Sequence, residues 1–206
     1  ADIYLGTPSG VTVTLAQLTL QKSYYYGIYA TGATTNVVLS GSTVQNNGSY
    51  GLYLTSINST SVTGGTIAAN SQYGLYVAGG TLNVNGTALS GHSTNDLYIG
   101  SSISTGTVQN ASMVSVYDAS GKTTFTGNTF GPGYGAPIST VHANDLGSFT
   151  SNNTFNTIAS PKTNVISGNV SRDSTWTTAA GTLVSNGSLS VQGTDGPDAV
   201  TTLTIN

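Results

Sequence analysis

A short motif, an apolar residue followed by tyrosine, returns along the first 117 residues and constrains the fold more than any other feature of the sequence. The tyrosines of this motif are, in order, Tyr4, Tyr29, Tyr53, Tyr76, Tyr98 and Tyr117. Successive members are 25, 24, 23, 22 and 19 residues apart. Self-similarity at such a period indicates a repeat architecture, in which each unit brings the chain back to the same place.

A second series of apolar residues supports the same repeat independently of the tyrosines. Its members come in pairs five residues apart, and we assign them as Leu15/Leu20, Leu39/Val44, Val62/Ile67, Val84/Leu89, Ile103/Val108 and Phe125/Phe130. From the second pair onward a glycine lies between the two members, namely Gly41, Gly64, Gly86, Gly106 and Gly127. Glycine tolerates left-handed backbone geometry, so each pair is expected to flank a tight corner between two short strands.

Each unit is expected to contain three short strands of alternating pattern. In Leu75-Tyr76-Val77 the alternation places leucine and valine inside and tyrosine outside. A unit of 19–25 residues is shorter than a propeller blade, and the chain lacks the 3.6-residue period of helical repeats. The sequence therefore predicts an all-β fold, a right-handed parallel β-helix (a solenoid) of about 7–8 coils. We assign residues 1–160 to this β-helix and residues 161–206 to a non-repeat, β-rich C-terminal segment, either a cap or the start of a next module or subunit contact.

Asparagine-rich corners carry a resemblance to a known family. Both Val44-Gln45-Asn46-Asn47-Gly48 and the segment from Phe125 to Phe130 have asparagine at such a corner. Over residues 1–160 the chain resembles the right-handed parallel β-helix of the pectate-lyase-like superfamily, and is most similar to its non-enzymatic, repetitive bacterial surface proteins and autotransporter-like adhesins. The resemblance implies a structural role and an extracellular or cell-surface location.

Charge and cysteine content exclude several classes of function. Only 5% of the residues are charged, against about 25% in an ordinary globular domain. Four basic residues and a net charge of −3 give no basic surface for nucleic acid. The absence of cysteine excludes disulfides and thiolate chemistry. No apolar run approaches the length of a transmembrane helix, so no membrane span is expected.

The two ends of the repeat raise a physical problem, because β-solenoids expose unpaired strand edges that natural proteins cover. Residue 1 enters the repeat at once, and the chain stops in Thr-Leu-Thr-Ile-Asn. Two interpretations stay open: the chain is a fragment of a longer rod, or copies pair head to tail into a filament. The residues assigned to such an end contact are Ile3, Trp176, Leu203 and Ile205.

Candidate catalytic residues are sparse. Asp96 and Asp118 lie 22 residues apart, about one coil, and a carboxylate pair can hydrolyse glycosides. They occupy different positions relative to their tyrosines, so two corner aspartates are the simpler interpretation. His92 and His142 lie far apart in the repeat and are interpreted as surface histidines. Polysaccharide lyases of the resembling superfamily use clustered aspartates with an arginine or lysine base, whereas Arg172 is the only arginine here.

One candidate metal site is Asp195 and Asp198 in Asp-Gly-Pro-Asp, where two carboxylates could hold calcium. The same residues also favour a plain turn, which is the simpler interpretation. We predict no catalytic residues and no cofactor.

The tyrosines are expected to stack along one outer face, with Tyr26, Tyr50 and Tyr73 as a second row. Stacked rings stabilise a sheet as cross-strand pairs do. Exposed rings also bind sugars or a second chain, so the six tyrosines of the first row are the candidate ligand or lateral contact face.

From these features we expect a non-catalytic extracellular structural protein, either a subunit of a head-to-tail filament or a rod segment of a cell-surface adhesin. A glycan-binding or glycan-cleaving β-helix is the alternative. Ice binding is a minor alternative. Flat β-helix faces with regular rows of threonine bind ice, whereas here the residues on either side of the first apolar residue of each corner pair mix threonine with serine, asparagine and alanine.

Overall fold

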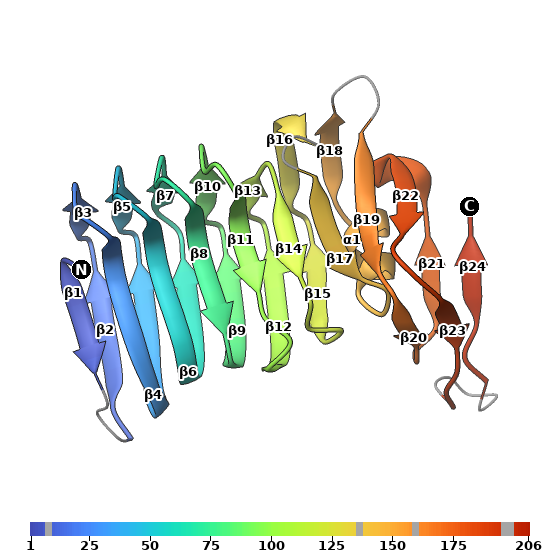
Figure 1. Cartoon of the computed structure of the whole chain (residues 1–206), viewed down its shortest axis with the longest axis horizontal. Coiled ribbons are helices and arrows are strands. Elements are labelled where there is room, and N and C mark those ends of the chain that lie inside the picture. The colour runs from blue at the N-terminus through green and yellow to red at the C-terminus, as the bar shows by residue number, and fades with distance from the viewer. Residues whose placement is uncertain (7–9, 135–137, 158–160, 195–199) are drawn as a thin grey trace.

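The computed structural model describes residues 1–6, 10–134, 138–157, 161–194 and 200–206. Its strands lie side by side in a long column, with the N-terminus at one end and the C-terminus at the other (Figure 1). The column is an all-β parallel solenoid of about eight turns, which confirms the predicted fold class. Every strand pair in the described residues is parallel, as expected when each coil repeats the path of the one before it.

The strands that carry the tyrosines form one face of the column, which we call the tyrosine face. Its strands are β1 (Ile3–Gly6), the first part of β4 (Tyr26–Ser40), the first part of β6 (Tyr50–Thr63), β8 (Tyr73–Ala78), β11 (Asn95–Ile99) and β14 (Val116–Asp118). Pairing joins Tyr4 to Tyr29, Tyr29 to Tyr53, and so on through Tyr117. The predicted register of the tyrosine motif is therefore confirmed.

Two further faces complete each coil. The second face consists of β2 (Thr12–Ala16), the ends of β4 and β6, β9 (Gly80–Asn85), β12 (Ile103–Gln109) and β15 (Thr123–Thr126). The third face consists of β3 (Thr19–Gln21), β5 (Thr43–Gln45), β7 (Thr66–Ala68), β10 (Ala88–Ser90), β13 (Ser112–Met113), β16 (Thr129–Tyr134) and β18 (Thr154–Thr157). Three short strands per unit, as predicted, thus enclose a single core.

At the corner between the second and third faces, the structure corrects the apolar pair that we expected in the fifth coil. In the fifth coil the strands pair Val108 with Val84 and Phe125, so the apolar pair is Val108/Met113 and not Ile103/Val108. The left-handed corner residue is then Asn110, with φ 52°, in place of Gly106. The error arose because Ile103 is also fully buried and happens to precede Val108 by the same five residues.

Alternation explains the core. Leu75 and Val77 are fully buried while Tyr76 between them is half-buried, and the same holds for Leu97, Ile99 and Tyr98. Towards the C-terminal half the leucines and valines give way to aromatic rings. The Phe125 and Phe149 rings meet edge to face with centroids 5.3 Å apart.

After β15 the second face changes its structure, because α1 (Leu146–Ser151) takes the place of a strand. The tyrosine-face sheet nevertheless continues through β17 (Ser139–His142), β19 (Lys162–Ile166) and β22 (Thr182–Ser185). Residues 161–206 also contain β20 (Gly168–Val170), β21 (Ser174–Trp176), η1 (Thr178–Ala180), β23 (Leu189–Val191) and β24 (Leu203–Ile205). This segment therefore extends the column while departing from its regular three-strand coil.

Candidate functional site

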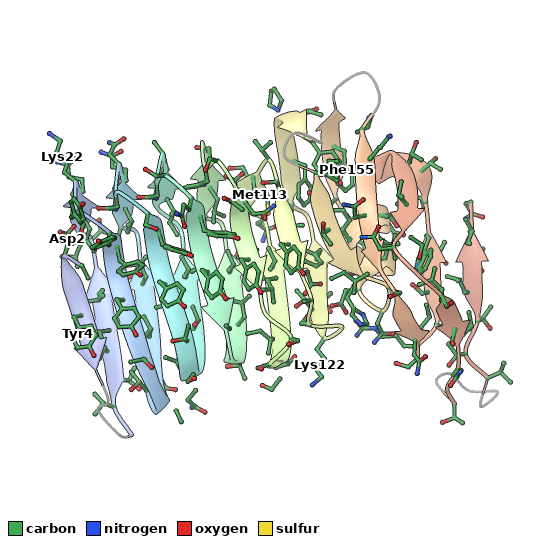
Figure 2. All side chains as sticks on the ribbon, viewed as in Figure 1. Asp2, Tyr4, Lys22, Met113, Lys122 and Phe155 are labelled. Atoms are coloured by element: carbon green, nitrogen blue, oxygen red, sulfur yellow. The ribbon has the colours of Figure 1, made fainter. Side chains whose placement is uncertain are left out.

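The first tyrosine row is a continuous stack of rings. From Tyr4 to Tyr117 the centroids of successive rings are 5.2, 5.6, 4.8, 4.2 and 4.9 Å apart, and the rings are tilted by at most 24° to one another. Figure 2 shows this row of rings beginning at Tyr4. Each ring inside the row therefore contacts a tyrosine ring on either side along the column.

The second row joins the first into one network. Tyr26, Tyr50 and Tyr73 contact one another along the column and contact the first row sideways, at centroid distances of 4.9–5.7 Å. Tyr25 extends the network from Tyr26 at 6.0 Å, and Tyr24 extends it from Tyr25 at 4.5 Å. Eleven of the twelve tyrosines therefore form one connected set, which we call the tyrosine network; Tyr134 alone lies apart, in the core.

Exposure within the network is uneven. The rings inside both rows are half-buried, whereas Tyr24 is 81% exposed, Tyr4 64% and Tyr25 55%. Burial, followed by repulsion between neighbouring phenolates, raises the pKa of Tyr50, Tyr53 and Tyr73. Burial and the hydrogen bond to Tyr98 raise the pKa of Tyr76. These four side chains are thus uncharged at neutral pH. The stacked rings of the network stabilise the sheet in the way cross-strand pairs do.

The stacking limits what this face can bind. A sugar ring packs onto the face of an aromatic ring, and the rings inside the row are half-buried between their neighbours. The most exposed rings of the network are those of Tyr4, Tyr24 and Tyr25, which makes these three the most accessible to a sugar. The sequence located the tyrosines correctly, but it did not reveal the orientation of their rings.

A buried pair of carboxyl groups joins three successive coils. Asp118 accepts hydrogen bonds from the Ser120 N–H at 2.9 Å and the Ser120 hydroxyl at 2.7 Å. Asp145 accepts from the Thr123 N–H at 3.0 Å and forms an ion pair with Arg172. Both carboxyl groups are fully buried.

Within this pair, the surroundings of Asp118 favour its neutral form. Burial, and then the charge of Asp145 nearby, raise the pKa of Asp118 well above its ordinary value. Asp118 is therefore a neutral acid that can donate its proton to Asp145, which is itself paired with Arg172. This pairing was missed from the sequence, where Asp96 was the partner considered for Asp118.

Asp96 belongs to a different buried group. Its Oδ1 lies 2.6 Å from His92 Nδ1, and its Oδ2 accepts the Val114 N–H at 2.6 Å. His92 Nε2 lies 3.3 Å from Asn70 Nδ2, which can only donate, so the ring proton is assigned to Nδ1. His92 is 6% exposed, which corrects its interpretation as a surface residue.

His142 is the last residue of β17, and its ring packs against the Gly121 position. Its Nδ1 accepts the Asn144 N–H at 3.1 Å. Burial lowers the pKa of His142, so the ring is neutral at physiological pH.

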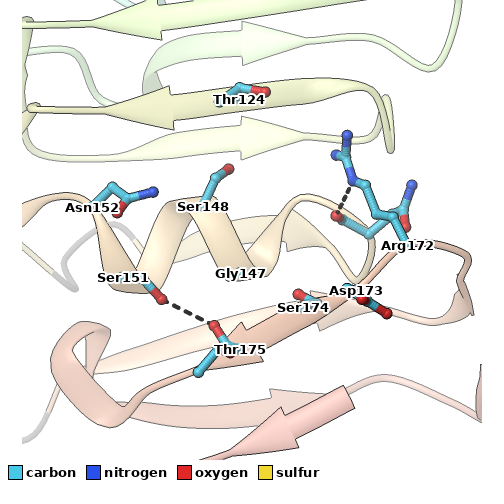
Figure 3. Close-up of a pocket in the computed structure, with 10 residues that line it drawn as sticks. Thr124, Gly147, Ser148, Ser151, Asn152, Arg172, Asp173, Ser174 and Thr175 are labelled. Atoms are coloured by element: carbon cyan, nitrogen blue, oxygen red, sulfur yellow. Dashed lines mark hydrogen bonds between the residues drawn. The ribbon is translucent and has the colours of Figure 1, made fainter. Parts of the chain in front are cut away.

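A polar cavity of about 310 Å³ lies where α1 meets β21. Figure 3 shows Ser148 and Ser151 on α1 beside Ser174 and Thr175 on β21, with Arg172 at one end and the Ser151 hydroxyl donating to the Thr175 carbonyl at 3.0 Å. Arg172 Nε donates to the Asn144 carbonyl at 3.0 Å, which holds its side chain against the wall. The described residues contain no group of three histidine, aspartate or glutamate side chains placed to hold a metal ion. Asp195 and Asp198 lie outside the described residues, so the calcium prediction stays untested.

Exposed large hydrophobic side chains gather at the two ends of the column. Of the ten among the described residues, nine belong to the first coil or to residues 184–205, namely Tyr4, Val11, Tyr24, Tyr25, Val184, Leu189, Val191, Val200 and Ile205. Ile3 lies on β1 in the first coil. Trp176 pairs with Ile205 and is itself buried, Leu203 is half-buried, and Ile205 is 66% exposed.

The regular stacking of parallel coils defines the class of protein as a β-helix. The family model for the right-handed β-helix region matches residues 3–194, and the chain belongs to this family. No curated protein and no solved structure matched the chain. Neither α1 nor η1, the helices of the described residues, has the length and apolar character required to cross a membrane.

Proposed function

We propose that the chain is a non-catalytic structural protein of the cell exterior, a rod subunit whose copies join end to end, in a filament or in the shaft of a surface adhesin. The observation that carries the proposal is the concentration of exposed apolar side chains in the end coils. Burial of such surface favours association, and each coil edge also offers unpaired backbone groups to the next coil.

The register of the tyrosine face supports this junction. The position of Tyr117 continues through Thr140 and Asn164 to Val184, so the same outward row begins at Tyr4 and ends at Val184. A second copy stacked in register would place the Tyr4 ring on Val184. Such a head-to-tail contact is heterologous and need not close, so it produces a filament.

A matched pair of lysine substitutions tests end-to-end assembly. We expect the wild-type protein to form longer particles as its concentration rises, measured by sedimentation and electron microscopy. Val184→Lys places a charge on the proposed junction and should abolish this growth, whereas Thr105→Lys, on an exposed mid-column position, should not. Monomers alone at all concentrations, salts and calcium levels, or equal effects of the two substitutions, would contradict the proposal.

The absence of catalysis is part of the proposal and rests on burial. Asp96, Asp118, Asp145 and His92 are all buried, so none of them can touch a polysaccharide chain in this conformation. Release of reducing or unsaturated ends from any member of a polysaccharide panel would contradict this part.

A glycan-binding role is the second candidate, favoured by one location. A hollow of about 600 Å³ is lined by Lys22, Tyr24, Tyr25, Asn46 and Gln72, among others, and it offers free ring faces beside polar groups. If glycans bind, Tyr24→Ala should remove binding to a polysaccharide array, while Tyr76→Ala should leave it. The reverse pattern would assign binding to the stacked row.

A further inference from the structure

The tyrosines dominate the oxidation chemistry of this chain. It contains no cysteine, one methionine and one tryptophan. Met113 is 1% exposed and Trp176 is 3% exposed, so neither is readily reached from solvent. A one-electron oxidant in solution therefore meets tyrosine as the accessible oxidisable side chain.

Ring contacts make the tyrosine network a continuous path for electrons. Successive centroids from Tyr117 to Tyr26 are no more than 5.7 Å apart, and most rings of the first row lie nearly parallel. Parallel rings in van der Waals contact have overlapping π systems, so an electron can move from one tyrosine to its oxidised neighbour. Tyr25 and Tyr24 continue this path to the surface.

Release of the phenol proton to water decides at which tyrosine the radical persists. A tyrosine that loses an electron becomes strongly acidic, and its radical persists where the phenol can release its proton to water. Inside the rows the hydroxyls are partly buried, and burial raises the pKa of Tyr50, Tyr53, Tyr73 and Tyr76. Tyr24, at 81% exposure, is the most accessible member of the network.

We propose that the tyrosine network carries one-electron oxidation along the column to Tyr24, and that Tyr24 is the site at which two copies of the chain become joined by a dityrosine bond. Each Tyr24 loses one electron and one proton, and the two radicals form a carbon–carbon bond ortho to their hydroxyls. The ring hydrogens displaced by the new bond return to the oxygens. With a haem peroxidase as the source of oxidation, the two electrons and two protons reduce one hydrogen peroxide to two waters. The inference rests on the ring contacts and does not require end-to-end assembly.

A tethered photo-oxidant tests the path. Thr140 follows Tyr117 in the row, so Thr140→Cys provides the only thiol and a place to attach a ruthenium polypyridyl label. Light and a cobalt(III) ammine, which accepts the electron irreversibly, then generate the oxidant at that end of the network. The measurements are the yield of covalent dimer and the position of the dityrosine bond by mass spectrometry. The unlabelled protein with free ruthenium complex gives the background from oxidation between molecules.

Two double variants, each with two tyrosines replaced by phenylalanine, distinguish electron transfer along the network from the mere loss of tyrosines. Tyr50→Phe with Tyr53→Phe removes every phenol from one coil and interrupts the path. Tyr50→Phe with Tyr73→Phe leaves Tyr53 and Tyr76, and hence the path, intact. Phenylalanine keeps the stacked rings, and circular dichroism and thermal unfolding verify the fold.

We expect the interrupted variant to lose Tyr24-linked dimer several-fold, while the control retains it. Tyr24→Phe should remove the dimer, and Tyr4→Phe, at the other exposed end, should not. Equal dimer yields from the two double variants would overturn the path. Dityrosine located at Tyr98, Tyr117 or Tyr4 in the wild type would overturn Tyr24 as the site.

Discussion

Asp118 is a fully buried acid in a chain in which only 5% of the residues are charged. Its Oδ1 accepts two hydrogen bonds from Ser120, while its buried Oδ2 accepts none from the described residues, and Asp145 lies nearby, so the neutral form suits this position. A buried carboxyl whose charged form is disfavoured destabilises the protein when it must ionise. Asp145 in turn joins its own coil to the next through Arg172, which lies 27 residues further along the chain.

The pH dependence of stability follows from Asp118. Because its folded pKa is raised, the folded state binds more protons than the unfolded state above the ordinary value of 3.8. The stabilisation that Asp118 contributes is therefore fully present below that pH and is lost as the pH rises through the folded pKa. The loss is about 1.4 kcal/mol for each pH unit by which the folded pKa exceeds the unfolded pKa.

Asp118→Asn should remove this dependence, because an amide can accept from Ser120 and donate to Asp145 without a charge. We expect a higher midpoint of thermal unfolding at neutral pH and a flatter profile above pH 4 than in the wild type. Asp2→Asn, at an exposed position, is the matched control and should change neither. A lower midpoint at neutral pH for Asp118→Asn would show that Asp118 is ionised there.

At the scale of elements, ladders of identical or similar side chains hold each coil to the next. Asn70 is the centre of one such ladder at the corner before the tyrosine face. Its Oδ1 accepts from Asn47 Nδ2 at 2.9 Å, and its Nδ2 reaches the Val44 carbonyl at 3.2 Å and His92 Nε2 at 3.3 Å. Its interior position makes these bonds costly to lose.

Asn70→Ala should therefore destabilise the protein more than an exposed ladder residue does. It removes a hydrogen-bond partner from buried groups of Asn47, Val44 and His92, and each buried group left unpaired costs about 1–3 kcal/mol. Gln45→Ala breaks the exposed bond between Gln45 and Gln21, and should cost less than about 0.5 kcal/mol. Chemical denaturation measures both, and equal losses would show that the corner ladder has no special role.

At the scale of the whole molecule, each coil touches only its neighbours, so the stability of a coil depends on whether both of its sides are covered. Among the described strands, β1 pairs only with β4, and β24 only with β21. Inner strands such as β9 are paired on both sides, by β6 and β12.

Hydrogen exchange should report this difference. In dilute protein we expect β1 and β24 to exchange faster than β9, because terminal strands open without disrupting the rest. At concentrations that favour assembly, protection should increase in β1 and β24 and stay unchanged in β9. Protection that rises uniformly, or in the tyrosine rows of the inner coils, would indicate lateral association in place of end-to-end contact.

The sequence by itself determined the period, the all-β class, the three strands per coil and the outward row of tyrosines. These follow from alternation and from short-range turn chemistry, which any coil carries within its own 19–25 residues. Residues Leu75, Tyr76 and Val77 already contain the inside-outside pattern that the structure confirms.

Only the tertiary structure decided which side chains meet between coils. The partner of Asp118 is Asp145 and not Asp96, His92 is buried, and the fifth corner lies at Asn110. Each of these outcomes depends on which residues the stacked coils bring together, and the repeat period alone does not determine this. The same holds for the tyrosine rings: their spacing is encoded in the repeat, while their tilt and their burial depend on how neighbouring rings pack in three dimensions.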